Sequence, residues 1–305
     1  MIKIISSHSG EGGSTEAFIQ MTNALNNAGY PCTFYGPDVF HLDKCSSVQT
    51  PWLRNCVWPD SLTQYGYAFL GRICSKKAHV FWPLWQRLSG FLEPEDRVVF
   101  HNIKGVPERP NVQRFLLSCH EQHVFPLKNE NCSVYDAIHF VSEHQRDWHN
   151  ILDTPSFVLP NFHVPLSKGP LLSQKVGGVV GAIYPDKATH EAIAWALRDS
   201  CDSVRVFGSV ADPDYFSFIQ KSFSKEIEEN KIIFCGFLLD KQAVYDSFSD
   251  LYMCSRYECL PNVVVEAMMV GKAIHIPDDR NYKYARYSDD HDKLLETWVS
   301  YLGLS

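Results

Sequence analysis

The sequence contains no uninterrupted apolar run long enough to cross a bilayer. Nowhere in its 305 residues do about 18 apolar residues follow one another, which is the length that a membrane-spanning helix requires. The amino-terminal stretch MIKIISSHSGEGG passes from a short apolar run directly into glycines, without the charged and long apolar regions of a secretory signal. We therefore expect a cytoplasmic chain without a signal peptide, and peripheral membrane contact stays open.

Basic clusters and paired cysteines are lacking as well. The formal net charge is −7 and no run of lysines or arginines occurs, so we expect no nucleic-acid partner. The 10 cysteines are scattered, with no C-x-x-C pair and no grouping with histidine at zinc spacing. The sequence thus predicts neither a disulfide framework nor a structural metal site, and free thiols in a reducing compartment are the plain interpretation.

Short apolar strands and amphipathic helices alternate along the chain. The opening consists of a strand at 2–6, a helix in TEAFIQMTNALNNAG and a strand at 32–36, which is a βαβ pattern. Ser14 or Thr15 is the expected helix cap, and Gly29 supplies the stop. Further strands are predicted at 97–102, 114–120, 137–142 and 156–161.

A stretch bearing Pro, Gly and Ser (163–175) interrupts this alternation, which then restarts. The pattern predicts an α/β protein with two consecutive doubly wound domains. We place the first domain at 1–164, the second at 165–282 and a final helix at 283–305.

Two glutamates frame the most informative stretch, SRYECLPNVVVEAMMVGKAI (255–274). Glu258 stands in a loop after a predicted strand, and Glu266 lies eight positions later inside a predicted helix with apolar neighbours. A buried carboxylate requires hydrogen-bond donors, which vicinal sugar hydroxyls supply, and free N–H groups at a helix start suit a phosphate. The pattern therefore indicates a site for an activated sugar, with one glutamate for a ribose and one for a hexose.

This stretch resembles the E-x7-E signature of retaining glycosyltransferases with the GT-B fold, family four in particular. The resemblance continues upstream through KIIFCGFLLDKQAVYDSFSDLYMCS, and in the first half through GGSTEAFIQMTNALNNAGYPCTFYG, HFVSEHQRDWH and VLPN. It touches most of the chain outside 38–96. It implies two Rossmann-like domains that face a cleft and close on the donor, with the final helix packing back on the first domain or mediating a homodimer.

The resemblance also implies roles for single residues in the second half. Glu266 would bind the ribose and Glu258 the donor sugar. The main chain near the phosphates would be that of Leu260, Pro261, Asn262 and Val263. The alternatives are a buried helix carboxylate that caps a neighbouring loop for Glu266, and a solvated loop residue for Glu258.

Positive charge is needed where a sugar–phosphate bond breaks, because negative charge grows on the departing diphosphate. The family places an arginine and a lysine five positions apart after the first strand of its second domain. Lys187 matches the lysine, whereas Ala182 stands at the arginine position. Either donor activation is weakened or another cation substitutes, with Arg256 and Lys272 nearest in sequence and Arg205 a weaker candidate. The alternative for Lys187 is an exposed lysine at a helix start.

In the first half, the loop SGEGGST matches a dinucleotide fingerprint poorly, because Thr15 stands where the third glycine belongs. The resemblance implies instead that Gly12 and Gly13 bring the main chain close to donor and acceptor, the alternative being a tight turn. His120 resembles the family's histidine that contacts the donor hexose, with Glu121 beside it. His101 also ends a predicted strand, and a structural role is the alternative for both.

Two further stretches have structural explanations that we prefer. The aromatic run HVFWPLWQRLSGFL (79–92) could line an acceptor groove or touch lipid, but core packing is the preferred interpretation. The DPD sequence at 212–214 imitates a metal-binding D-x-D motif, and we interpret it as a helix N-cap. We expect no catalytic metal and no cofactor apart from the nucleoside-diphosphate sugar as co-substrate.

The resemblance predicts a metal-independent hexosyltransferase that retains configuration and transfers to a saccharide or lipid-linked acceptor, as in polysaccharide or glycolipid biosynthesis. The departing phosphate helps to deprotonate the acceptor in that family, so no protein nucleophile is required. Two alternatives remain open: a degenerate sugar-nucleotide-binding protein without activity, and a sugar-nucleotide epimerase or phosphorylase of the same fold. The sequence leaves the nucleobase, the sugar, the acceptor and the choice between monomer and homodimer undecided.

Overall fold

The structure, a computed structural model of the whole chain, describes residues 1–6, 12–37, 45–51, 53, 87–101, 108–120, 132–280, 282 and 290–304. The chain divides into two compact units, Met1–Phe162 with Asp290–Ser305 (unit 1) and His163–Asp289 (unit 2). The division falls at Phe162 and His163, close to the boundary after residue 164 that the sequence suggests. The last segment of the chain belongs to unit 1.

Unit 1 contains a parallel seven-stranded sheet in the order β3-β2-β1-β4-β5-β6-β7. Its strands are β1 (Ile2–Ser6), β2 (Cys32–Gly36), β3 (Ser47–Gln49), β4 (Arg97–His101), β5 (Arg114–Cys119), β6 (Ala137–Phe140) and β7 (Ser156–Val158). The central strands are buried on both faces, as near-continuous apolar sequence predicts for a parallel sheet. The order reverses between β1 and β4, where ligands bind in doubly wound sheets.

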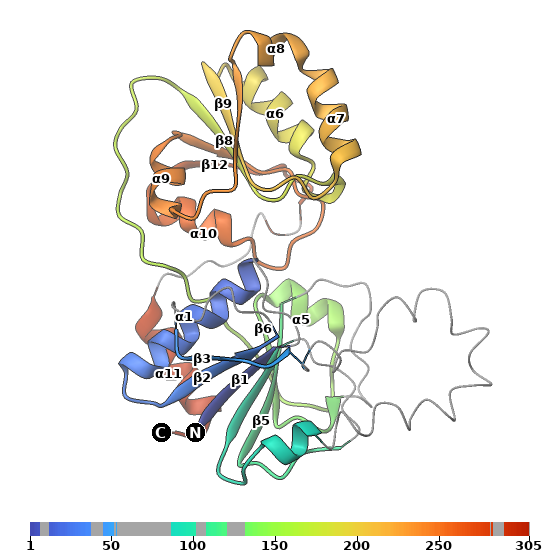
Figure 1. Cartoon of the computed structure of the whole chain (residues 1–305), viewed down its shortest axis with the longest axis vertical. Coiled ribbons are helices and arrows are strands. Elements are labelled where there is room, and N and C mark those ends of the chain that lie inside the picture. Colours follow the sequence, from blue (N-terminus) through green and yellow to red (C-terminus); the bar gives the residue numbers. More distant parts are fainter. Residues whose placement is uncertain are drawn as a thin grey trace, which may run out of the picture. The chain divides into compact units, whose positions relative to one another are not determined.

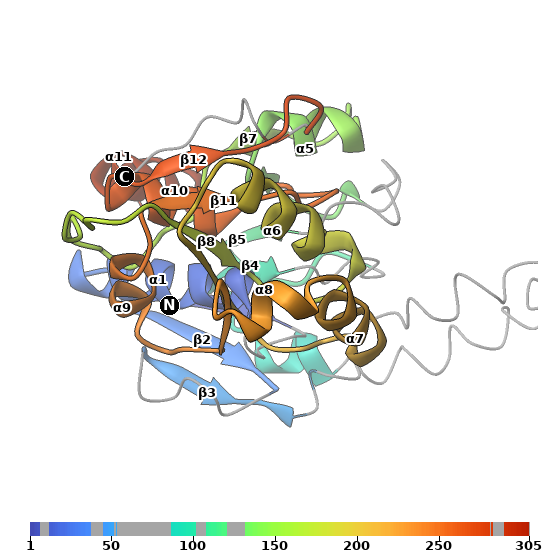
Figure 2. The same ribbon diagram turned by 90° about the horizontal axis from the view of Figure 1, so that it is seen from above.

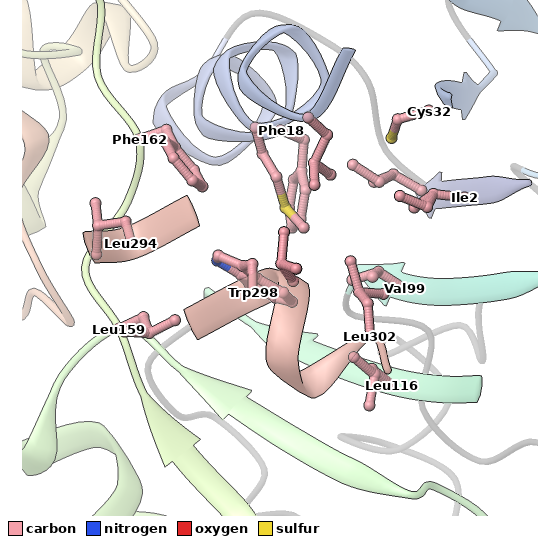
Figure 3. Packing of buried hydrophobic residues seen from close by; sticks show 14 of the residues in the cluster. Ile2, Phe18, Cys32, Val99, Leu116, Leu159, Phe162, Leu294, Trp298 and Leu302 are labelled. Carbon is pink, nitrogen blue, oxygen red and sulfur yellow. The ribbon is translucent and has the colours of Figure 1, made fainter. Parts of the chain in front are cut away.

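Helices α1 (Gly13–Asn27) and α11 (His291–Tyr301) pack together against one face of this sheet (Figure 1). Helix α1 contributes Phe18, Met21 and Leu25, which share its buried face. Figure 3 shows Trp298 of α11 and Phe18 in one packed layer over the strands that carry Val99 and Leu116. Helix α11 thus completes the apolar core of unit 1.

The other face of the sheet is covered by helical residues 87–91 and by α5 (Glu143–His149). Leu88 and Leu92 are buried there, so the described end of the aromatic run 79–92 packs in the core. The rest of that run lies outside the described residues. Figure 2 shows the short strand β3 at the edge of the sheet beside β2.

Unit 2 contains a parallel five-stranded sheet in the order β10-β9-β8-β11-β12. Its strands are β8 (Val176–Val180), β9 (Ser203–Phe207), β10 (Ile232–Gly236), β11 (Asp250–Tyr252) and β12 (Ala273–His275). Its helices are η2 (Pro185–Lys187, a 3-10 turn), α6 (Thr189–Arg198), α7 (Pro213–Ser222), α8 (Ser224–Glu228), α9 (Lys241–Asp246) and α10 (Asn262–Met269). Figure 1 shows α6, α7 and α8 on one side of the sheet and α9 and α10 on the other.

Strand and helix alternate as the sequence predicts, and both units are doubly wound α/β folds. The expected cap of the first helix was wrong. Helix α1 begins at Gly13 with Gly12 at its N-cap, so Ser14 and Thr15 lie in the first turn and provide no side-chain cap. The expected stop is confirmed, because Gly29 follows α1 with a φ of 85° that favours glycine.

Two smaller expectations concern polar residues and cysteines. Asp212 caps α7 by accepting a hydrogen bond from the main-chain N–H of Tyr215 (2.9 Å), which confirms the N-cap interpretation of the DPD sequence. The cysteines of the described segments form no disulfide with one another. Within those segments, no helix has the length and apolarity needed to cross a membrane.

Candidate functional site

Unit 2 carries an ion pair at the point where its strand order reverses. Strands β8 and β11 are neighbours although they are not consecutive, and the segments that follow them carry Lys187 and Glu258 respectively. The Lys187 ammonium pairs with Glu258 Oε1, and the two side chains are 29% and 14% exposed. Two of the predicted catalytic residues therefore meet where this fold binds ligands.

The charges of this pair stabilise each other in a partly buried place. Burial alone opposes the charge of the Lys187 ammonium, but the adjacent Glu258 carboxylate outweighs it and raises the lysine pKa above its usual value. Lys187 is therefore protonated at neutral pH. The pair can open toward a ligand that offers a phosphate to the lysine and a hydroxyl to the carboxylate.

The two loops that hold this pair are tied together by their main chains. Lys187 ends the 3-10 turn η2, and the next residue, Ala188, is buried in the left-handed conformation with a φ of 47°. Next to Lys187, the carbonyl of Asp186 accepts a hydrogen bond from the N–H of Arg256 (2.8 Å). Arg256 and Glu258 are thus anchored beside η2.

One of the three cations weighed against the missing arginine, Arg256, is tied by this main-chain hydrogen bond to the residue before Lys187. Its guanidinium is half exposed and lies 3.7 Å from Glu191 Oε1, while Arg280 lies 3.4 Å from Glu191 Oε2. Lys272 follows the carboxyl end of α10, its N–H bonding to Ala267, and Arg205 lies within β9. Ala182 itself follows β8 and is partly buried.

Glu266 is buried in α10 and bound by two side chains of α9. It is 4% exposed, and it accepts hydrogen bonds from Lys241 Nζ at Oε1 (2.6 Å) and from the Tyr245 hydroxyl at Oε2 (2.6 Å). Burial and the neighbouring Glu266 raise the pKa of Tyr245 well above its usual range, so Tyr245 remains a donor. Both of these partners are side chains of α9, so Glu266 joins α10 to α9 in addition to any role in binding a ligand.

Helix α10 begins directly after the Glu258 loop and leaves its amino end without a side-chain cap. Pro261 occupies the N-cap with no side-chain hydrogen bond, and Leu260, Asn262 and Val263 surround this end. The first intrahelical bond is donated by the N–H of Val264 to the Pro261 carbonyl (3.0 Å). The partial positive charge of this helix end favours an anion.

In unit 1, Gly12 is the N-cap of α1 and Gly13 is its first residue, although the sequence placed both in the loop before the helix. Gly12 is extended and a Cβ placed on it would contact nothing within 4 Å. The hydroxyl of Thr15 is buried in the same turn, and no residue of the described segments hydrogen-bonds to it. Among the described residues, Gly12 thus leaves open space at the amino end of α1.

Three histidines cluster near the carboxyl ends of neighbouring strands in unit 1. His101 ends β4 and lies 2.8 Å, through Nδ1, from the Ser6 hydroxyl at the end of β1. His120 directly follows β5, and its ring centre lies 5.2 Å from that of His101 and 5.9 Å from that of His139. The predicted catalytic histidine is therefore part of a cluster at the point where the strand order reverses. Glu121 lies outside the described residues.

Hydrogen bonds fix which nitrogen of His120 carries a hydrogen. His139 Nε2 donates to the Leu159 carbonyl (2.8 Å), and burial lowers the pKa of His139 to about 4, so its Nδ1 is bare at neutral pH. Ser118 Oγ therefore donates to His139 Nδ1 (2.7 Å) and accepts from His120 Nε2 (3.1 Å).

Burial, and then the neighbouring His101 and His139, lower the pKa of His120 well below its usual value. Since Nε2 carries the hydrogen of this neutral ring, Nδ1 is a hydrogen-bond acceptor.

Ser6, Ser118, His139, Lys241 and Tyr245 were not singled out from the sequence. Ser118 and His139 lie in two different predicted strands, and the sequence of a strand does not show which residue of another strand lies beside it. The pairing of β5 with β6 places these two residues side by side. Lys241 and Tyr245 share one face of α9, a spacing that suggests a helix face but gives no partner. No group of three or more His, Cys, Asp or Glu side chains in the described segments could hold a metal ion.

A separate cavity of about 590 Å³ lies along one face of α6 in unit 2. Trp195, Arg198, Phe223 and Ile276 are among the residues that line it. It includes none of the residues predicted for the site.

Neither a family model nor a curated protein matches the sequence. Solved structures do share the fold. HepE from Anabaena, in complex with UDP and glucose, is 13% identical over 98% of this chain and 89% of its own, with a TM-score of 0.63.

TarM from S. aureus is 10% identical over 99% of this chain and 91% of its own, with a TM-score of 0.65. The lipopolysaccharide outer core galactosyltransferase WaaB is 15% identical over 99% and 90%, with a TM-score of 0.60. At these identities the likeness establishes the fold alone. The chain has two Rossmann-like units of the GT-B type, as the sequence predicts.

Proposed function

We propose that the protein is a glycosyltransferase that moves a hexose from a nucleoside-diphosphate sugar to a saccharide or lipid-linked acceptor, with retention of configuration. The observation that carries this proposal is the Lys187–Glu258 pair at the reversal of strand order in unit 2, directly before the start of α10. The similarity of the fold to HepE, whose structure holds UDP and glucose, adds support.

In the proposed complex, each side chain of unit 2 acts on a different part of the donor. Lys187 leaves Glu258 for the diphosphate and, together with the N–H groups of α10, stabilises the negative charge that grows as the sugar departs. Glu258, released from the lysine, accepts a hydrogen bond from the donor hexose. Glu266 keeps two free acceptor positions for the ribose.

Further parts of the proposal concern unit 1 and the cation that replaces the family arginine. His120 would accept a hydrogen bond from a sugar hydroxyl at Nδ1, and the main chain at Gly12 and Gly13 would lie near the phosphates or the acceptor. Arg256 is our candidate for the second cation, since its main chain is bonded beside η2. The reaction would need no metal ion, and the protein would act in the cytoplasm or at a membrane surface.

Binding of nucleoside diphosphates tests the donor site directly. We expect UDP, GDP or ADP to raise the melting temperature of the wild-type protein, because a ligand that binds only the folded state stabilises it. Lys187→Gln and Glu266→Gln should each weaken this binding about tenfold, since each removes a charged hydrogen-bonding group. Glu228→Gln, on the exposed end of α8, is the matched control and should bind like the wild type. Binding that survives both site substitutions unchanged would refute the assignment.

The degenerate, non-catalytic alternative is favoured by one observation, Ala182 in place of the family arginine. Turnover distinguishes it from the enzyme. A glycosyltransferase should hydrolyse or transfer the sugar of its preferred donor, and Glu258→Gln should abolish that reaction while leaving diphosphate binding in place. Binding without any turnover in the wild type supports the degenerate protein. Conversion of the donor into an isomeric nucleotide sugar, without an added acceptor and without release of the diphosphate, would instead indicate an epimerase.

A further inference from the structure

Glu266, Lys241 and Tyr245 form a compact cluster between α9 and α10. Both oxygens of the Glu266 carboxylate are 2.6 Å from a donor, Lys241 Nζ on one side and the Tyr245 hydroxyl on the other. The tyrosine hydroxyl also lies 3.3 Å from the Val263 carbonyl. Lys241 Nζ contacts no other acceptor in the part of the chain that the structure describes.

The hydrogen-bonding capacity of this cluster is only partly used. A carboxylate offers about four lone pairs, and two of those on Glu266 are taken. An ammonium carries three hydrogens, and Lys241 directs one at Glu266. Acceptors and donors thus stand side by side, which matches hydroxyl groups, since each hydroxyl donates one hydrogen bond and accepts others.

The exposure of the three side chains shows which of them a ligand meets first. Lys241 is 29% exposed, whereas Glu266 and Tyr245 are buried. A ligand that reaches the carboxylate from solvent therefore lies against the lysine. Tyr245 holds the carboxylate from behind and is a positioning residue.

We propose that Lys241 and Glu266 together bind the vicinal diol of the donor's ribose, with Lys241 donating to the hydroxyl oxygen whose hydrogen is accepted by Glu266. Lys241 then selects ribonucleoside over deoxyribonucleoside diphosphates. This inference rests on the proposed function, because the ribose is that of the nucleoside-diphosphate sugar. It adds the positively charged Lys241 to Glu266 as a second residue that binds the ribose.

Lys241 and Glu266 select against a deoxyribose because it leaves their polar groups without hydrogen-bond partners. Where a hydroxyl is replaced by hydrogen, one ammonium donor and one carboxylate acceptor face a C–H group. Buried polar groups without partners weaken binding far more than a missing apolar contact does. Selection should therefore depend on Lys241 as well as on Glu266.

The test measures binding of one nucleoside diphosphate with its 2′-deoxy and 3′-deoxy forms, by calorimetry, to the wild type and to Lys241→Met. The base is the one, among uracil, guanine and adenine, whose diphosphate binds the wild type most tightly. We expect the ribo form to bind the wild type at least tenfold more tightly than one of the deoxy forms. Lys241→Met should weaken binding of the ribonucleoside diphosphate about tenfold and binding of that deoxy form less than twofold.

Two variants separate recognition from folding and from general charge. Lys241→Arg keeps a donor and should retain part of the selection. Lys221→Met, on the exposed face of α7, removes an equal charge from the same unit and should change none of the affinities. Melting of each variant without ligand shows whether it is folded.

One outcome would overturn the inference: Lys241→Met leaves the ratios between the three affinities unchanged, whether all three fall equally or none falls. That outcome leaves the proposed function standing. Failure of the proposed function has a different signature, since no nucleoside diphosphate would then bind the wild type at all.

Discussion

Lowering the pH from 7 to 5 should destabilise unit 1 through His139. This side chain is 2% exposed and donates to the Leu159 carbonyl, so it has no room for a hydrated charge. Its pKa is about 4 in the folded protein, against an ordinary value of 6.5. Well above pH 6.5 neither the folded nor the unfolded state binds the proton, so His139 does not lower the free energy of unfolding there.

Between pH 6.5 and pH 4 the unfolded chain takes up a proton at this position and the folded chain does not. Stability is therefore lost as the pH falls. One pKa unit corresponds to about 1.4 kcal/mol, so the difference between 6.5 and about 4 gives a loss of about 2 kcal/mol between pH 7 and pH 5 and about 3 kcal/mol in the limit. His120, whose pKa is also lowered by burial, acts in the same direction.

Urea unfolding at pH 7 and pH 5 measures this loss, with His139→Asn as the comparison. Asparagine keeps an acceptor for Ser118 but does not titrate, so the variant should lose about 2 kcal/mol less than the wild type over the same range. Carboxylates contribute equally to both proteins and cancel. The reasoning is refuted if both proteins lose the same stability, or if NMR titration of labelled histidine places the His139 transition near pH 6.5.

Three substitutions test the packing and the caps. Gly208→Ala should lower the free energy of unfolding of unit 2 by about 2–3 kcal/mol, because φ is 143° and the new Cβ would lie 1.9 Å from the Gly181 carbonyl oxygen. Gly181→Ala has a similar φ of 148°, but its Cβ would meet no described atom within 4 Å, so it should lower the free energy of unfolding less. Equal melting temperatures of the two variants would contradict the steric argument. Trp298→Ala should cost about 3–5 kcal/mol in unit 1, measured by denaturation, whereas Trp148→Ala, at a side chain that is 40% exposed, should cost less than about 1 kcal/mol. Asp212→Ala should cost about 1 kcal/mol through the lost cap of α7, and a loss of donor turnover beyond that of stability would point to a metal role instead.

The order of strands and helices could be predicted because most strands are short apolar runs and, in much of the chain, amphipathic helices alternate with them. Strand β3 could not be predicted, because Ser47–Gln49 contains a single apolar residue and lies at the edge of the sheet. The continuous helical pattern of YFSFIQKSFSKEI (215–227) is divided at Phe223, where α7 ends and α8 begins. A propensity pattern does not reveal such a break.

The site was predictable where residues follow strands at the reversal of order, which is a property of topology. Lys187 and Glu258 are of this kind. The partners of Glu266 were not predictable, because its contact with Lys241 and Tyr245 depends on how α9 packs against α10. The Ser118–His139 link likewise depends on the register of β5 and β6.

The position of α11 bears on how the chain acquires its structure during synthesis. Leu294, Trp298 and Leu302 fill the core of unit 1, and Arg97 donates a hydrogen bond to the Leu302 carbonyl (2.8 Å). A ribosome would release these residues only after all of His163–Asp289. Unit 2 can therefore fold before unit 1 is complete. Until α11 has been made, unit 1 has an exposed apolar face, which is the kind of surface that chaperones bind.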